Sequence, residues 1–97
     1  MKNYDCIIIG GGIGGLVSGC YLTKYGFKVL LIEKNQELGG YCQSVRKDGF
    51  IFTSCIRGFV GCKEGGVFDI VLNELSLKRE LRLVRPKVYD LIRFNNY

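Results

Sequence analysis

The sequence predicts an α/β fold: a parallel βαβ unit, followed by a β-hairpin, a helix and two further strands. Three observations lead to this prediction, namely an apolar run at 6–9, a glycine-rich turn directly after it, and a second apolar run at 29–32. Unbroken apolar runs of this length are typical of parallel strands that are covered on both faces. With 47% hydrophobic and 24% charged residues, the 97-residue chain has a globular composition and the length of one small domain.

The glycine-rich turn has the spacing Gly-x-Gly-x-x-Gly, set by Gly10, Gly12 and Gly15. Between a strand and a helix, this spacing is the fingerprint of a Rossmann-like dinucleotide-binding unit. The first glycine makes the tight turn, the second lets the main chain approach a pyrophosphate, and the third lets helix and strand pack closely. The helix expected over 14–25 begins with free N–H groups and a positive dipole end, which suits a diphosphate.

An acidic residue stands where the same fingerprint requires one. Glu33 ends the second apolar run, 18 residues after Gly15 and 23 after Gly10. A carboxylate at the end of the second strand accepts hydrogen bonds from the ribose hydroxyls of adenosine. A purely structural glycine turn is the alternative, but strand, turn, helix, strand and acid follow one another within about 30 residues. The sequence therefore predicts an adenine dinucleotide as ligand.

A second glycine pair, Gly39-Gly40, follows six residues after Glu33. It brings more bare main chain toward the predicted ligand, and the Ser44 hydroxyl is within reach of a phosphate in this interpretation. A loop turn without a ligand is the alternative. A flavin dinucleotide lies extended across a larger protein surface than NAD and has more use for a second loop. FAD is therefore the expected cofactor, and NAD is the less favoured one.

The rest of the chain contains weaker signals. Asp48-Gly49 predicts a two-residue hairpin turn between strands at 44–47 and 50–53. Residues 67–75 have apolar side chains at helical spacing, and the predicted buried face consists of Val67, Ile70, Val71 and Leu75.

Two further strands are predicted at 81–84 and 88–94, separated by Arg85-Pro86-Lys87.

Cysteine usage and charge exclude several classes of protein. The absence of histidine and of any C-x-x-C pair argues against a zinc site and against a His-based triad. Five cysteines scattered through apolar segments (Cys6, Cys20, Cys42, Cys55 and Cys62) are typical of reduced, buried thiols in a cytoplasmic protein. The net charge of +5 is spread along the chain, so we expect no nucleic-acid partner. No transmembrane segment is expected, and peripheral membrane contact stays open.

Taken together, these motifs resemble the N-terminal, FAD-binding part of the phytoene desaturase, carotenoid isomerase and retinol saturase group of flavoprotein oxidoreductases. The resemblance covers essentially residues 3–94 and rests on the blocks 5–16, 29–34, 38–44, 48–52, 65–67 and 74–77. It implies FAD held by Gly10, Gly12, Ile13, Gly14, Gly15, Glu33, Lys34, Gly40 and Ser44. In such enzymes the flavin transfers hydride at a carbon–carbon bond of an apolar polyene, and the protein supplies placement.

The chain departs from this family in two respects. Thr53–Gly58 stands where the family usually has Asp, then a small residue, and often His, in a segment that approaches the flavin. The family's substrate domain and C-terminal flavin-binding segment have no counterpart in the 97 residues. We therefore expect one truncated domain over 1–97 that is inactive alone, with a second polypeptide supplying the rest. A non-catalytic nucleotide-binding module and a fragment of an NAD-dependent oxidoreductase are the alternatives.

Overall fold

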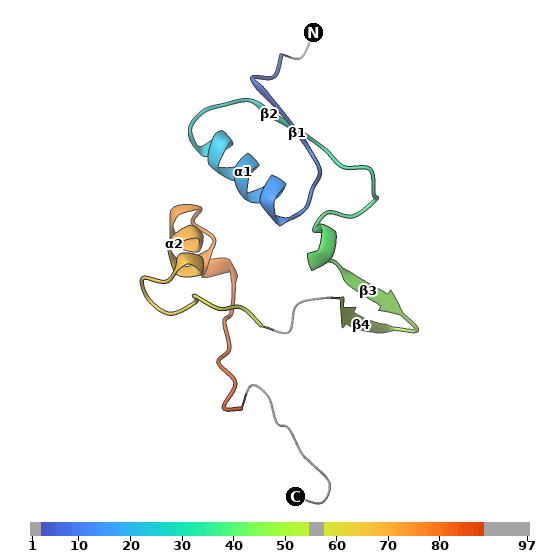
Figure 1. The fold of residues 1–97 in the computed structure, drawn as a ribbon, viewed down its shortest axis with the longest axis vertical. Helices are drawn as coiled ribbons and strands as arrows, with labels where there is room; N and C mark the ends of the chain where they lie inside the picture. The colour runs from blue at the N-terminus through green and yellow to red at the C-terminus, as the bar shows by residue number, and fades with distance from the viewer. Residues whose placement is uncertain (1–2, 55–57, 89–97) are drawn as a thin grey trace, which may run out of the picture.

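The computed structural model describes residues 3–54 and 58–88 and shows a chain of small units rather than one rounded body (Figure 1). The elements are β1 (Cys6–Ile9), α1 (Ile13–Lys24), β2 (Val29–Ile32), the 3₁₀ turn η1 (Gly40–Cys42), β3 (Ser44–Lys47), β4 (Phe50–Thr53), α2 (Val67–Glu74) and the 3₁₀ turn η2 (Lys78–Glu80). The predicted α/β class is confirmed, with the βαβ unit first and the hairpin and second helix after it.

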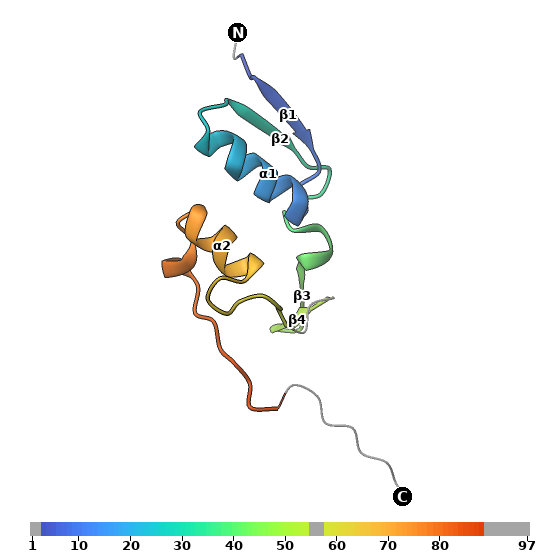
Figure 2. The same ribbon diagram turned by 60° about the vertical axis from the view of Figure 1, so that its left-hand side comes forward.

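The βαβ unit pairs β1 with β2 in parallel, in register from Cys6 opposite Val29 to Ile9 opposite Ile32. Helix α1 covers one face of this two-stranded sheet (Figure 2). Its glycine at position 19 allows a close approach, because a Cβ there would lie 3.3 Å from Cδ1 of Ile8. Both predicted strands are confirmed, and α1 begins one residue earlier and ends one residue earlier than expected.

Gly26 terminates helix α1 as the sequence predicts, because it follows the helix in a left-handed conformation (φ 90°). The amide of Gly26 donates to the carbonyl of Thr23, and the amide of Phe27 donates to that of Leu22, each at 3.0 Å. These two bonds form a Schellman motif, which satisfies carbonyls that would otherwise have no partner at the helix end. The chain then enters β2 at once.

The hairpin of β3 and β4 is also confirmed, with Ser44 opposite Thr53 and Lys47 opposite Phe50. Asp48 and Gly49 both have positive φ, 50° and 79°. A two-residue turn with both residues in this region is type I′, whose twist matches that of the paired strands.

Helix α2 has the predicted start but buries a different face. Val67 and Ile70, predicted to be buried, are 76% and 46% exposed, whereas Leu72 is 5% exposed and is the one buried apolar side chain among the described residues. The rotation of the helix follows from contacts that periodicity does not encode. Phe68 packs on Phe59 with ring centroids 4.9 Å apart.

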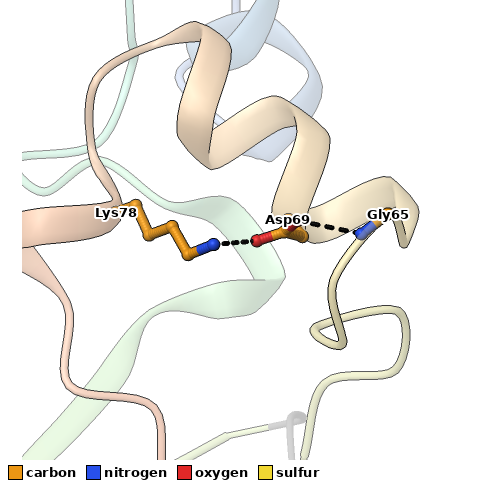
Figure 3. A network of polar contacts seen from close by, with 3 residues as sticks. All are labelled: Gly65, Asp69 and Lys78. Atoms are coloured by element: carbon orange, nitrogen blue, oxygen red, sulfur yellow. Dashed lines mark hydrogen bonds and ion pairs between the residues drawn. The ribbon is translucent and has the colours of Figure 1, made fainter.

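Polar contacts fix α2 as well. The carboxylate of Asp69, which is 6% exposed, accepts hydrogen bonds from the amide of Gly65 at 3.0 Å and from the ammonium of Lys78 (Figure 3). Tyr21 and Lys24 of α1 donate to the side chain and the main-chain carbonyl of Glu74, so the two helices lie side by side.

The two further strands are not formed in the part of the chain that the structure describes. Residues 81–84 follow η2 as extended chain, with Leu81 at φ −116° and ψ 129°, but no ladder joins them to another described segment. A strand is stabilised by its partner, and the nearest predicted partner, 88–94, lies outside the described residues except for Val88. The prediction of a strand at 81–84 was wrong, because residues that favour an extended backbone form a strand only when a partner strand pairs with them.

Burial is lower than the sequence suggests. The sheet face away from α1 is uncovered, with Ile7 58% and Ile9 86% exposed, so the prediction that β1 is covered on both faces was wrong. The four described cysteines are free thiols, of which Cys20 and Cys42 are exposed, which contradicts their predicted burial; Cys55 lies outside the described residues. Within 3–54 and 58–88, no helix has the length and apolarity needed to cross a bilayer.

Candidate functional site

The glycine turn between β1 and α1 forms the centre of the candidate site. Gly10 has φ 103°, a conformation that side chains disfavour, and its amide donates to the carbonyl of Ile32 at 2.7 Å. Gly15 faces the carbonyl of Gly10 so closely that a Cβ would lie 2.1 Å from that oxygen. These two glycines are therefore required for the shape of the turn itself.

The other glycines of the turn leave space on its outer side. A Cβ on Gly12 or Gly14 would meet no atom within 4 Å. The first hydrogen bond of α1 runs from the amide of Leu16 to the carbonyl of Gly12, and no described residue accepts from the amides of Gly14 and Gly15. The first turn of α1 carries no acidic residue to neutralise its positive end. Open space, free donors and a positive dipole end therefore coincide, as an anion-binding helix start requires.

The carboxylate of Glu33 lies beside this turn. Its Oε2 accepts from the amide of Gly11 at 2.7 Å and its Oε1 accepts from the amide of Asn35 at 2.8 Å. These two main-chain hydrogen bonds lower the pKa of Glu33 below its ordinary value, and the bond from the Asn35 amide has the larger effect. The positive charge of Lys34 lowers this pKa further. The ionised group has further lone pairs beyond these two bonds, so each oxygen keeps acceptor capacity for a ligand hydroxyl.

The second glycine pair reaches the same place. The amide of Gly39 donates to the carbonyl of Gly11 at 2.7 Å, and Gly12 and Gly39 form an isolated parallel bridge. A Cβ on Gly40 would lie 3.2 Å from the Cα of Gly12. The structure thus brings together two turns that the sequence separates by more than 20 residues, as the prediction for Gly39-Gly40 requires.

Gly11, the residue at which these interactions meet, was not among the residues predicted from the sequence. Gly11 is buried, donates to Glu33 and accepts from Gly39. A Cβ there would lie 2.5 Å from Cδ2 of Leu38 and 3.2 Å from Oε2 of Glu33. The only available signal was a glycine at a position where the fingerprint accepts any residue.

Three residues predicted to bind the cofactor make no hydrogen bond to the glycine turn among the described residues. Ile13 opens α1 with 57% of its surface exposed, and Lys34 lies exposed next to Glu33. Ser44 is exposed at the start of β3, and its hydroxyl makes no hydrogen bond to a described residue. Their roles toward a cofactor stay predictions.

Comparison with known proteins agrees with this geometry. Residues 8–75 match the family described as the NAD(P)-binding Rossmann-like domain. The chain is 50% identical over 52 residues to the carotenoid 3,4-desaturase of Haloarcula japonica, covering 54% of this chain and 10% of that protein. It is 36% identical over 75 residues to the chloroplastic prolycopene isomerase of Daucus carota, and 33% identical over 75 residues to the all-trans-retinol 13,14-reductase of Rattus norvegicus.

The last two alignments each cover 77% of this chain and 12% of the relative. The chain thus spans about a tenth of the length of the curated relatives it matches. The expected resemblance to the desaturase, isomerase and retinol saturase group is confirmed by these similarities. Because the family match covers more than half of the chain and includes the end of β1, the glycine turn, β2 and the second glycine pair, the chain belongs to the NAD(P)-binding Rossmann-like domain family.

Proposed function

We propose that this chain holds the adenosine diphosphate part of FAD, as the nucleotide-binding segment of a carotenoid desaturase-like oxidoreductase. The observation that carries the proposal is the position of Glu33, whose carboxylate is hydrogen-bonded to the glycine turn while keeping free acceptor capacity. The names of the relatives, a carotenoid desaturase, a prolycopene isomerase and a retinol reductase, support the class of oxidoreductase.

The residues present fit the diphosphate and the ribose of such a cofactor. The amides of Gly14 and Gly15 lie in the first turn of α1, and a Cβ on the neighbouring Gly12 would meet no atom within 4 Å. They would donate to phosphate oxygens, and Glu33 would accept from the ribose hydroxyls. Gly40 and Ser44 would extend the contact along the second loop. A bound flavin supplies hydride transfer, and the residues described here bind and orient its nucleotide half.

Catalysis itself requires more than this segment. The chain spans 10% and 12% of its relatives, so we propose that further sequence or a second polypeptide supplies the substrate site. Alone, the chain would bind nucleotide without turnover. We also propose a cytoplasmic location, because an odd number of cysteines scattered along the sequence is typical of reduced thiols.

NAD is the alternative cofactor, because the description of the matched family names NAD(P). Both cofactors contain adenosine diphosphate, so the contacts proposed above do not discriminate between FAD and NAD. The second glycine loop on the first turn favours FAD, which needs a longer binding surface. Calorimetric titration with FAD, NAD and ADP decides between them: FAD binding more tightly than ADP supports the proposal, and NAD binding more tightly than FAD contradicts it.

Glu33 provides the sharpest test. The wild-type chain should bind ADP about tenfold more tightly than 2′-deoxy-ADP, because the deoxy ligand leaves a carboxylate lone pair unpaired. Glu33→Ala should weaken ADP binding and abolish this preference. Glu64→Ala, which removes an exposed carboxylate far along the chain, is the matched control and should keep both affinities. Isothermal titration calorimetry measures the affinity of each of the three proteins for each of the two ligands.

This design separates recognition from folding. Glu33 also accepts a hydrogen bond from the Gly11 amide, so its loss would loosen the turn and weaken the binding of both ligands by the same factor. A preference for ADP that survives in Glu33→Ala would show that the carboxylate does not bind the ribose. The proposal for Glu33 would then be wrong.

A further inference from the structure

The loop that follows β2 places a leucine methyl group against the glycine turn. A Cβ built on Gly11 would lie 2.5 Å from Cδ2 of Leu38, so this methyl group occupies the space that a side chain at position 11 would need. The same point lies 3.2 Å from Oε2 and 3.3 Å from Cβ of Glu33. The methyl group of Leu38, the bare main chain of Gly11 and the side chain of Glu33 therefore meet at one place.

Hydrogen bonds fix the main chain on both sides of Leu38. The next residue, Gly39, donates its amide to the carbonyl of Gly11 at 2.7 Å. The preceding residue, Glu37, accepts at its carbonyl a hydrogen bond from Nε2 of Gln43 at 2.6 Å, which closes the loop over 37–43. Within this loop, η1 lies next to the start of α1 (Figures 1 and 2). The loop thus presents the Leu38 side chain to the glycine turn.

A methyl group in this place has two effects on the carboxylate of Glu33. It excludes water from one side of the hydrogen bond between the Gly11 amide and Oε2, and water is the competitor that weakens such a bond. It also takes up space beside the carboxylate, which reduces the number of rotamers open to the Glu33 side chain. A carboxylate already held in one orientation loses less conformational entropy when a ligand hydroxyl binds to it.

We propose that Leu38 is a positioning residue for nucleotide recognition: packed on Gly11, it holds the Glu33 carboxylate in the orientation that accepts from a ribose hydroxyl. This inference rests on the proposed function, and Leu38 acts through Glu33. The alternative is that Leu38 stabilises only the loop. Loss of a loop contact would weaken every adenine nucleotide by the same factor, whereas loss of the carboxylate orientation would weaken only nucleotides that carry the 2′-hydroxyl.

Calorimetric titration with ADP and 2′-deoxy-ADP separates these two roles. In Leu38→Ala, the preference for ADP should fall from about tenfold to about threefold or less, and the affinity for 2′-deoxy-ADP should be retained. Leu38→Met keeps the volume and a terminal methyl group, so it should keep the preference. Leu81→Ala is the matched control, because it truncates a leucine of similar exposure outside the loop, 49% against 53%, and should leave both affinities unchanged.

Amide hydrogen exchange of the ligand-free chain gives a second readout that needs no nucleotide. In Leu38→Ala, the Gly11 amide should exchange about tenfold faster, because its hydrogen bond to Glu33 opens more often. The Gly10 amide, which donates to the carbonyl of Ile32 at 2.7 Å, is the internal reference and should exchange at the wild-type rate. Since Leu38 is half exposed, its truncation leaves no closed cavity and should preserve the fold.

Three results would overturn the inference. The first is a Leu38→Ala chain that keeps the full wild-type preference for ADP, and the second is Gly11 exchange at the wild-type rate in that variant. The third is equal acceleration at Gly10 and Gly11, which would show a general loosening of the turn. A wild-type chain that binds ADP and 2′-deoxy-ADP equally would instead contradict the proposed role of Glu33 toward the ribose, and Gly11 exchange would still decide whether Leu38 holds the carboxylate.

Discussion

Glycines that look equivalent in the fingerprint have different physical roles here. Gly15 has no room for a side chain, because the carbonyl of Gly10 occupies the position a Cβ would take. Gly14 has room, because nothing lies within 4 Å of that position. The fold therefore requires glycine at position 15, whereas it requires glycine at position 14 only if a ligand occupies the open space.

Alanine substitutions should separate these two roles. Gly14→Ala should raise the free energy of unfolding by about 0.5 kcal/mol, because alanine is the better helix former, yet weaken ADP binding by filling the open space. Gly15→Ala should lower both stability and affinity, because the Cβ would lie 2.1 Å from an oxygen. Urea titration and calorimetry measure the two quantities. ADP affinity unchanged in Gly14→Ala would contradict a diphosphate at this helix start.

The two helices end in the same way but with different residues. Both close with a Schellman motif, α1 at Gly26 and α2 at Ser76, where the amide of Leu77 donates to the carbonyl of Leu72 at 2.8 Å. Ser76 has φ 59°, a conformation that costs a residue with a Cβ about 1 kcal/mol. The end of α2 is therefore strained where the end of α1 is not.

This difference predicts opposite effects of two substitutions. Ser76→Gly should increase the free energy of unfolding by about 0.5 kcal/mol, because relief of the strain exceeds the added entropy of the unfolded chain. Gly26→Ala should decrease it by about 1 kcal/mol through conformational strain alone, since no atom lies within 4 Å of the added Cβ. Urea unfolding followed by circular dichroism measures both. A loss of stability in Ser76→Gly would show that the Ser76 side chain makes a contact worth more than the strain.

At the scale of the molecule, a few polar contacts hold together segments that a large hydrophobic core would hold together in most proteins. Asp69 links the loop before α2 to Lys78 after it, and Lys78 together with the Gly65 amide lowers the pKa of this carboxyl (Figure 3). Between the helices, the hydrogen bond to Glu74 raises the pKa of Tyr21 to about 12. Leu72 is the one buried apolar side chain among the described residues, so these polar contacts contribute an unusually large part of the stability of the tertiary structure.

Stability should therefore depend on pH at both extremes. A lowered carboxyl pKa contributes stability above the unfolded value, 3.8 for Asp69, and this contribution is lost as the pH falls through the folded pKa. The raised pKa of Tyr21 contributes stability below 10.0, which is lost as the pH rises toward about 12. Asp69→Asn should flatten the acid limb of a urea-unfolding series across pH, and Glu64→Gln should not. An unchanged acid limb in Asp69→Asn would show that this network does not stabilise the fold.

The local elements were predictable because their signals are local. Two apolar runs, a glycine fingerprint and Asp48-Gly49 each specify a backbone path within a few residues, and β1, α1, β2 and the hairpin form as expected. The spacing of Glu33 from the glycines also placed an acid at the turn. Local pattern failed at 81–84, because a strand needs a partner that its own residues do not provide.

Sequence alone thus determined the βαβ unit, the hairpin and the position of the first glycine turn, since backbone conformation and spacing decide these. Only the tertiary structure decided that Gly39 bonds to Gly11, that Glu33 is held by the Gly11 amide, and that α2 turns Leu72 rather than Val67 inward. The reason is physical: register between distant loops and the rotation of a helix are set by packing and hydrogen bonds between segments that no single stretch of sequence contains.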